Sequence, residues 1–341
     1  MRNYFKAAVL REHYSPLSIE TFKKESPEKG QVLVKMISSG LCGAQINEID
    51  AVKGQDKYMP HFMGHEGYGK VLEIGEGVTK VKPNDYVVLH WRKGSGCDCF
   101  GGKYFTDLGL VGSGPVTTFA EQTIVAENRI TPVSPDDELN NLFPLMGCAL
   151  STAYGIAKDV KKEQTVLVLG AGGLGLTIAF WLKVLYNIST IIVDKYESKR
   201  MFSEQYGVFY STEKNSNILK ELDKTDIVID TTGDVDIISS GFSLVKKQGS
   251  LILVGQPRVG KALVLENALS IFDGIKIYSS DGGNFDPDRD LSTIVDLVKS
   301  NLDLAKTLVT DVIGIEKINE GFDMIRKGKS GRVVINFEEA H

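Results

Sequence analysis

Long apolar runs and an excess of positive charge are both missing from this chain of 341 residues. The longest apolar run lies within residues 173–186 (GLGLTIAFWLKVLY) and is too short to cross a bilayer. The formal net charge of -5 gives no electrostatic reason to bind nucleic acid or an anionic membrane surface. We therefore expect a cytoplasmic protein whose partner is a small molecule rather than nucleic acid or a membrane.

Cysteine and histidine are also scarce, with four and five residues respectively. Four cysteines do not make a disulfide framework in a chain of this length. A reducing compartment keeps their thiols available as metal ligands, and the cysteines concerned are Cys42, Cys97, Cys99 and Cys148.

The chain is longer than one hydrophobic core usually supports, and its pattern changes near residue 165. From residue 30 to residue 127, glycine separates short β-like runs such as QVLVKMISSG, which is typical of an antiparallel or partly open barrel. From residue 165 onwards, apolar strands alternate with helical patterns, which is typical of a doubly wound, mostly parallel sheet. The strand-like run at residues 331–337 is placed to return to the first domain. We expect an α/β protein with two domains.

A glycine-rich turn opens the second pattern. The segment VLVLGAGGLG places Gly170, Gly172 and Gly175 in a G-x-G-x-x-G spacing between a strand and a helix, which predicts a pyrophosphate-binding loop. Asp194 ends the next strand, where a carboxylate accepts the hydroxyls of an adenosine ribose and repels a 2′-phosphate. We therefore expect NAD rather than NADP. The alternative is a glycine-rich turn with a surface aspartate.

Basic residues follow Asp194, and their positive charge weighs against the expected preference for NAD over NADP. They are Lys195, Lys199 and Arg200, and the alternative for each is a solvated helix start. Our candidates for binding the cofactor from this region are Gly170, Gly172, Gly173, Leu174, Gly175, Asp194 and Lys199.

Three soft ligands lie in separate segments of the first pattern. Cys42 and His65 each lie in a glycine-bracketed turn, and Cys148 lies in the segment PLMGCALSTAYG. Cysteine, histidine and cysteine suit zinc, and three protein ligands leave one position open for substrate or water. Unpaired cysteines are also common as small buried apolar residues, so spacing alone leaves both readings open.

The segments GLCG, GHEGYGKVLEIGEGVTKVKPNDYVV, GCALSTAYG and VLGAGGLG occur in an order and spacing that closely resembles the zinc-dependent medium-chain alcohol and polyol dehydrogenases. The resemblance covers nearly the whole chain. It implies a GroES-like catalytic domain formed by residues 1–155 and 295–341, and a Rossmann NAD-binding domain at residues 156–294. It also implies a homodimer or homotetramer built by edge-to-edge pairing of the Rossmann sheets.

The same resemblance assigns roles to individual residues. It implies one catalytic zinc held by Cys42, His65 and Cys148, with Glu66 as a neighbouring or exchangeable ligand. Further implied positions are Thr152 beside the nicotinamide, Arg332 at the cofactor phosphates and Trp91 against the substrate. The alternative for Arg332 is an exposed charge before a strand.

The sequence departs from the family at the proton relay. Many relatives carry a hydroxyl two residues after the first cysteine, and some carry a histidine five residues after it; here these positions are Ala44, in the expected substrate pocket, and Asn47. We expect the proton to travel through Glu66, through His61 or through a substrate hydroxyl, with Glu66 ahead of His61.

A second departure concerns the segment RKGSGCDCFGGKYF. Relatives with a structural zinc carry four close cysteines here, whereas this chain has Cys97 and Cys99, so we expect no structural zinc. Arg92 and Lys93 lead into the segment, and they are either a cationic pair for a substrate phosphate or ordinary solubilising charge.

These observations favour an NAD-dependent alcohol or polyol dehydrogenase that transfers hydride between NAD(H) and a polyol, a sugar or a phosphorylated derivative. One alternative is a zinc-free quinone or enone reductase of the same fold, which the intact ligand set argues against. Another is a non-catalytic NAD-binding redox sensor, which the missing relay motivates.

Overall fold

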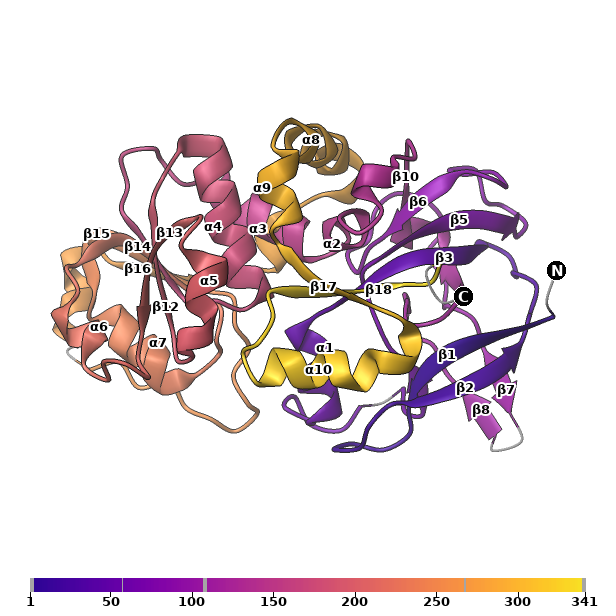
Figure 1. The fold of residues 1–341 in the computed structure, drawn as a ribbon, viewed down its shortest axis with the longest axis horizontal. Helices are drawn as coiled ribbons and strands as arrows, with labels where there is room; N and C mark the ends of the chain where they lie inside the picture. The colour runs from indigo at the N-terminus through magenta and orange to yellow at the C-terminus, as the bar shows by residue number, and fades with distance from the viewer. Residues whose placement is uncertain (1–2, 57, 107–108, 267, 339–341) are drawn as a thin grey trace.

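The computed structural model describes residues 3–56, 58–106, 109–266 and 268–338 of the chain. Figure 1 shows a half built on a parallel sheet and a half built on antiparallel strands, with helices α2, α3, α8 and α9 between them. The intervening helices are α2 (Phe143–Met146), α3 (Ala149–Ala157), α8 (Pro287–Ser300) and α9 (Leu302–Lys306).

The larger sheet of this half is mostly antiparallel and takes strands from both ends of the chain. Its strand order is β10 (Ile130–Val133), β6 (Tyr86–Leu89), β5 (Gly67–Ile74), β3 (Gln31–Leu41), β18 (Arg332–Asn336) and β17 (Val309–Ile313), with β9 (Gln122–Ala126) also on β3. β18 pairs with β3 from Val333 opposite Leu41 to Asn336 opposite Ser38. The expected return of the last strand to the first domain is confirmed, and Figure 1 shows the yellow strand beside β3.

A second, smaller sheet and a hairpin complete this half. The sheet has the order β2 (Ser18–Lys23), β1 (Tyr4–Leu10) and β4 (His61–Phe62), and the hairpin joins β7 (Tyr104–Thr106) to β8 (Gly109–Val111). Aromatic side chains fill the space between them, and the rings of Phe62 and Tyr104 stack at 4.4 Å.

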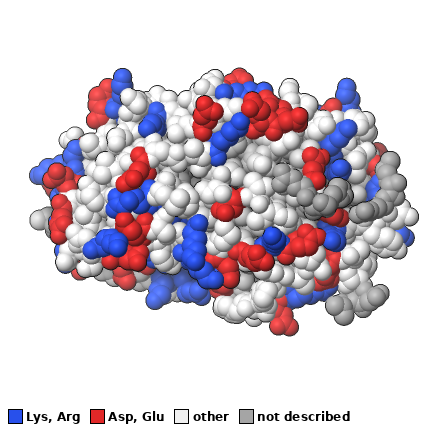
Figure 2. All heavy atoms as spheres, viewed as in Figure 1, with Lys and Arg blue, Asp and Glu red and all other residues white. Residues whose placement is uncertain are grey.

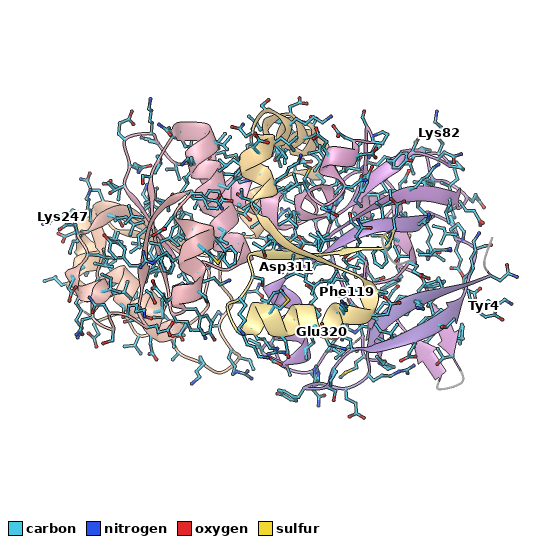
Figure 3. The ribbon with its side chains drawn as sticks, viewed as in Figure 1. Tyr4, Lys82, Phe119, Lys247, Asp311 and Glu320 are labelled. Atoms are coloured by element: carbon cyan, nitrogen blue, oxygen red, sulfur yellow. The ribbon has the colours of Figure 1, made fainter. Side chains whose placement is uncertain are left out.

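Two helices close the other side of this half. They are α1 (Gly43–Ile49) and α10 (Ile318–Arg326), whose apolar residues share one core. Figure 3 labels Phe119 at α10, where its ring lies 6.0 Å from that of Phe322. This packing holds the start of α1, which directly follows Cys42.

The second half is a parallel, doubly wound sheet, as predicted. Among the described residues its strand order is β13 (Gly207–Ser211), β12 (Thr190–Asp194), β11 (Val166–Leu169), β14 (Thr225–Asp230), β15 (Val245–Leu253) and β16 (Lys276–Ser279). The order reverses direction at β11, and ligands bind such sheets at the carboxyl ends of the strands beside that point.

Alternating residues of β11 enter two different cores. Val166 and Val168 pack with α3, α8 and α4 (Gly173–Tyr186), whereas Leu167 and Leu169 pack on the opposite face. That face is covered by α6 (Ile218–Glu221) and α7 (Val235–Phe242), and α5 (Arg200–Ser203) lies against β13. Burial on both faces explains the continuous apolar run of this strand.

The position of α8 follows from its sequence. Asp286 accepts hydrogen bonds from the backbone N–H groups of Asp288 and Arg289, and Pro287 occupies the first turn, so the helix begins there. Leu291, Ile294 and Val298 share one face of the helix and enter the central core. Because α8 crosses residue 295, we propose residues 156–294 only as the approximate extent of the cofactor domain.

Surface charge is mixed in sign. Figure 2 shows basic and acidic side chains interspersed on one face of the molecule, in keeping with the small net charge. No helix in the described ranges is long and apolar enough to span a membrane.

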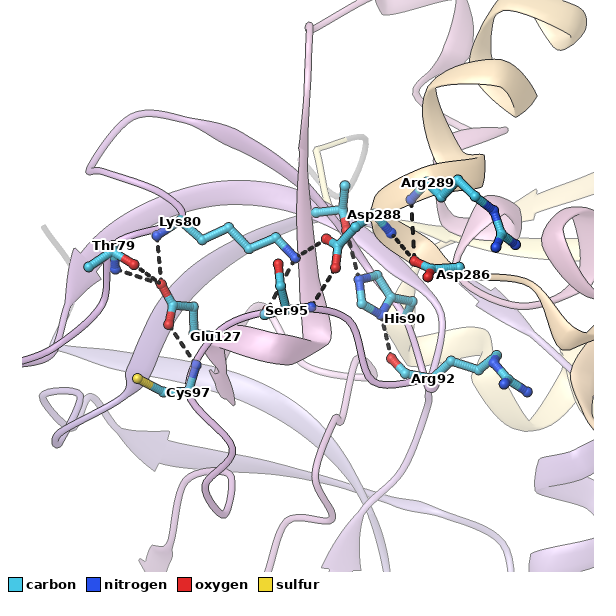
Figure 4. A network of polar contacts seen from close by, with 11 residues as sticks. Thr79, Lys80, His90, Arg92, Ser95, Cys97, Glu127, Asp286, Asp288 and Arg289 are labelled. Carbon is cyan, nitrogen blue, oxygen red and sulfur yellow. Dashed lines mark hydrogen bonds and ion pairs between the residues drawn. The ribbon is translucent and has the colours of Figure 1, made fainter.

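Two carboxylates fasten the loop that contains Cys97 and Cys99 (Figure 4). Glu127, which is buried, accepts hydrogen bonds from the backbone N–H of Thr79, of Lys80 and, at 2.7 Å, of Cys97. Asp288 accepts a hydrogen bond from the backbone of Ser95 and pairs with Lys80. The loop that carries Trp91 is therefore tied to the strand region on one side and to α8 on the other.

We expect Glu127→Gln to lower the free energy of unfolding at pH 7 by about 1–3 kcal/mol, because three N–H donors face two oxygens and an amide turns its own N–H toward one of them. Burial raises the pKa of Glu127, but these donors outweigh it, and the net pKa is lowered. A lowered carboxyl pKa stabilises the fold above the unfolded value, about 4.3, and this contribution disappears as pH falls through the folded value.

Denaturant unfolding at several pH values measures this difference, and Glu163→Gln at an exposed position is the control, with a change within about 0.5 kcal/mol. A Glu127→Gln variant as stable as the wild type at pH 7 contradicts the assignment.

Candidate active site

A cavity of 1140 Å³ runs between the two halves of the molecule. One side is lined by residues at the carboxyl ends of the parallel strands, including Gly170, Asp194 and Thr231. The other side is lined by Cys42, His65 and Cys148. The cavity therefore joins the predicted cofactor loop to the predicted metal ligands.

The three expected metal ligands converge. Cys42 directly precedes α1, His65 lies in the turn between β4 and β5, and Cys148 directly precedes α3. Their ligand atoms all lie within 4.8 Å of one another. His65 Nε2 is buried without a hydrogen-bond partner, as a donor atom reserved for a metal requires. This set fits a zinc site with one open position.

Neighbouring groups prepare the cluster for a cation. The hydrogen bond with Cys148 lowers the pKa of the Cys42 thiol well below its ordinary value, and His65 and Arg332 act in the same direction. Gln45 joins two of the ligands, since its side-chain oxygen accepts the backbone N–H of Cys42 at 3.0 Å and its amide nitrogen contacts His65 Nδ1. A lowered thiol pKa favours the thiolate, which is the metal-binding form.

Glu66 has a different partner from the one we expected. Within the described residues, the group able to hold a metal consists of Cys42, His65 and Cys148, without Glu66. The fully buried Glu66 carboxylate instead forms an ion pair with Arg332 and accepts the backbone N–H of Ala149 at 3.3 Å. A carboxylate held in this way is poorly placed to carry the substrate proton.

Arg332 is not an exposed charge. It is 2% exposed, and its side chain lies so close to the start of α4 that a Cβ at Gly173 would come within 2.4 Å of it. It also lines the cavity. Arg332 thus connects Glu66, beside a metal ligand, to the loop predicted to hold the cofactor phosphates.

The cavity near the metal cluster contains an acid–base pair. Ala44 and Asn47 line it, as expected for the positions that lack the usual relay groups. His61 also lines it, and its Nδ1 lies 3.0 Å from an Asp56 carboxylate oxygen. Burial raises the pKa of Asp56, but the His61 hydrogen bond and a backbone N–H outweigh it, and the net pKa is lowered. The pair resembles a base oriented by a carboxylate.

The glycine loop has the geometry that its spacing predicts. Gly170 has φ +98°, a conformation that favours glycine. A Cβ at Gly172 would meet nothing within 4 Å, which leaves room for a phosphate, and a Cβ at Gly175 would come within 1.9 Å of the Gly170 carbonyl oxygen. Asp194 accepts the backbone N–H of Ala171 at 2.7 Å and lines the cavity.

Other expected residues divide between the cavity and the core. Leu174, Thr152 and Trp91 line the cavity, and a Cβ at Gly282 would come within 2.2 Å of the Trp91 ring. Lys199 is buried, and its ammonium group donates to the Ser330 carbonyl oxygen. Lys195 lines the cavity instead.

Arg92 and Lys93 do not line the cavity in the described structure. Arg92 pairs with Asp281, and Lys93 pairs with Asp98 at 2.5 Å. Both charges are therefore engaged with carboxylates, which favours the structural alternative for this pair.

Sequence reasoning missed several charged residues of the cavity, among them Glu48, Asp56 and Arg129. Burial raises the pKa of Glu48. A sequence signal existed for Glu48, which lies on the short helix that Cys42 precedes. None existed for Arg129, which reaches the cavity only through the fold.

Two family patterns match the chain. The family described as "Alcohol dehydrogenase GroES-like domain" matches residues 28–135, and the family described as "Zinc-binding dehydrogenase" matches residues 173–300. The first match confirms the GroES-like part of the expected fold. Together the two matches cover more than half of the chain.

Similar proteins and structures extend over the whole length. The chain is 27% identical to S-(hydroxymethyl)glutathione dehydrogenase of Photobacterium damsela subsp. piscicida, over 97% of this chain and 99% of that protein. It is 28% identical to alcohol dehydrogenase 2 of Oryza sativa subsp. japonica, over 98% and 97% respectively.

Among solved structures, benzyl alcohol dehydrogenase from Acinetobacter calcoaceticus has a TM-score of 0.86 at 23% identity and covers 98% of this chain and 99% of its own. This structural likeness supports the fold. With both family patterns and the full-length relatives in agreement, the chain belongs to the zinc-dependent medium-chain dehydrogenase/reductase family.

Proposed function

We propose that the protein is a zinc-dependent dehydrogenase that transfers hydride between NAD(H) and the alcohol or carbonyl carbon of a polyol, a sugar or a phosphorylated derivative. The observation that carries this proposal is the convergence of Cys42, His65 and Cys148 on a cavity that also reaches the glycine loop. The intact ligand cluster disfavours a zinc-free reductase, and the His61–Asp56 pair removes the reason for a non-catalytic sensor.

In this proposal Cys42, His65 and Cys148 hold one zinc, which supplies a Lewis acid for deprotonating an alcohol or polarising a carbonyl. The chain's own residues orient the reactants. The loop at Gly170–Gly175 and Arg332 bind the cofactor phosphates, Asp194 accepts the ribose hydroxyls, and Thr152 lies beside the nicotinamide. Trp91 closes the substrate end of the cavity and excludes water there.

We assign the proton to His61 rather than to Glu66. In this assignment Nε2 of His61 is the acceptor, because an Asp56 carboxylate oxygen lies 3.0 Å from Nδ1 on the other side of the ring. The proton passes from the substrate hydroxyl to His61 Nε2, and Asp56 stabilises the resulting cation. Glu66, paired with the buried Arg332, keeps its charge in place.

We further propose a cytoplasmic homodimer or homotetramer. All four cysteines are unpaired, which fits a reducing compartment. The edge strand β16 carries exposed Tyr278, and the preceding segment exposes Leu269, Ile271 and Phe272. An apolar sheet edge of this kind supports pairing with a second copy.

The metal assignment is tested by single substitutions. We expect Cys42→Ala, His65→Ala and Cys148→Ala each to remove the zinc and to lower kcat by about 10³-fold or more, because the Lewis acid supplies several kcal/mol. Mass spectrometry of the metal content and NADH formation measure both effects. Cys97→Ala and Cys99→Ala are the matched controls and should keep the zinc. Two zinc ions per chain, or full activity without metal, rule the assignment out.

The cofactor assignment predicts that Asp194→Ala lowers the ratio of kcat/KM for NAD over NADP by about 10- to 100-fold, since the ribose loses its acceptor and the 2′-phosphate loses its repulsion. Asp194 also holds the backbone of Ala171, so Asp194→Asn, which keeps one acceptor oxygen, controls for disturbance of the loop. A wild-type enzyme that prefers NADP shows that a nearby lysine overrides the carboxylate.

The proton path predicts that His61→Ala lowers kcat by about 10²-fold and changes its pH profile, whereas Ala44→Thr changes it little because another group already carries the proton. Asp56→Asn should give an intermediate loss, since it keeps the contact with His61 and removes the charge. Steady-state kinetics over a range of pH distinguish these cases. If the pH profile of His61→Ala is unchanged, His61 is not the proton-transfer group, and a substrate hydroxyl or Glu48 takes that role.

A further inference from the structure

Arg129 is a buried arginine at the substrate end of the cavity. It lies directly before β10, is 8% exposed and lines the cavity. One of its Nη atoms donates to the carbonyl oxygen of Trp91, and its backbone oxygen accepts the N–H of His90 at 3.0 Å. The side chain is therefore held against the segment that contains Trp91.

Arg129 forms no ion pair with a carboxylate within the described residues, and its Nε is buried without a hydrogen-bond partner. Asp98 acts on its charge, but Asp98 is held by Lys93 at 2.5 Å and by Asn128 at 3.1 Å. Burial lowers the pKa of Arg129, yet a guanidinium stays protonated in proteins. A buried, unpaired charge is costly, so a partner is expected in the functional state.

The other arginines of this region have partners. Arg332 is paired with Glu66, and Arg92 is paired with Asp281. Among these three arginines, Arg129 is therefore the one at the cavity wall without a carboxylate partner in the described residues. Because the guanidinium is planar with several N–H donors, it suits the oxygens of a phosphate or a carboxylate.

The path from Arg129 to the metal cluster runs through Trp91. The backbone N–H of Trp91 donates to the carbonyl oxygen of Gly147 at 3.4 Å, and Gly147 directly precedes Cys148 in the chain. An anionic group at Arg129 therefore lies on the Trp91 side of the cavity, while the reacting carbon lies at the metal ligands. The glycine loop lies on the opposite side of the cavity, so the cofactor phosphates and the substrate anion would bind at different places.

We propose that Arg129 binds the anionic group, a phosphate or a carboxylate, of the substrate that is oxidised or reduced at the metal cluster. This inference rests on the proposed function and narrows its substrate class to anionic polyols or sugars. Arg129 acts as a specificity residue that contacts the substrate away from the reacting carbon.

The test compares short-chain polyols, the same polyols phosphorylated at a terminal hydroxyl, and aldonates of the same chain length. We expect the wild type to prefer one anionic class in kcat/KM by on the order of 10²-fold. Arg129→Met should remove most of this preference through KM and leave the neutral polyol within about threefold. Arg129→Lys, which keeps the charge without the planar fork, should be intermediate and guards against a folding defect.

Arg92→Met is the matched control: Arg92 belongs to the neighbouring loop, does not line the cavity and already has a carboxylate partner in Asp281, so its loss should leave the preference unchanged. The inference is overturned by a wild type that prefers neutral polyols, or by an Arg129→Met variant that slows neutral and anionic substrates equally. A rise in KM for NADH alone assigns Arg129 to the cofactor and also overturns it.

A binding measurement separates this inference from the proposed function. Tryptophan fluorescence of the zinc-loaded protein with NADH is titrated with the same compounds, with Trp91 next to Arg129 as the reporter. Tight anion binding that Arg129→Met abolishes supports the anion site even where no compound turns over, and the dehydrogenase proposal then fails alone. If the protein turns over neutral alcohols but shows no anion binding that depends on Arg129, the dehydrogenase proposal stands and the anion site at Arg129 is wrong.

Discussion

The buried ion pair between Glu66 and Arg332 connects the parts of the molecule on which the site depends. Glu66 follows His65 in the chain, and Arg332 begins the last strand and packs against the start of the cofactor helix at Gly173. Both side chains are almost fully buried, and loss of one partner from such a pair typically costs about 3–5 kcal/mol. The metal turn, the C-terminal strand and the glycine loop are therefore held in one arrangement.

The Glu66–Arg332 ion pair also distinguishes two kinds of charged group at the site. The Glu66 carboxylate is held in an ion pair with Arg332, whereas the His61–Asp56 pair lines the cavity. The hydrogen bond between the Cys42 and Cys148 thiols lowers the pKa of Cys42, with smaller contributions from His65 and Arg332, and raises the pKa of Cys148.

A loop fastened by carboxylates serves the other end of the cavity. Glu127 gathers backbone N–H groups from two segments, and Asp288 joins the same loop to α8. Trp91 and Arg129 depend on this support, because both lie where the loop meets β10.

Local patterns in the sequence indicated the fold class and the glycine loop, whereas the ligand roles of Cys42, His65 and Cys148 came from the family resemblance, because their spacing alone left both readings open. Strand and helix periods depend on neighbours in the chain, and Gly170, Gly172 and Gly175 act within one turn, so their consequences are readable without a structure. The return of the last strand to the first domain was also expected, but its place beside β3 was not. The bounds of the domains stay a prediction, and α8 spans the expected boundary at residue 295.

Only the tertiary structure decided which charges are free. From the sequence, Glu66 was a candidate for proton transfer and Arg92 a candidate for binding a substrate phosphate. In the structure both form ion pairs with residues distant in sequence, Arg332 and Asp281 respectively. Arg129 carried no motif and became significant only because the fold buries it at the cavity without a carboxylate. The energy of a charge depends on burial and on its nearest opposite charge, and both are properties of the folded arrangement rather than of local sequence.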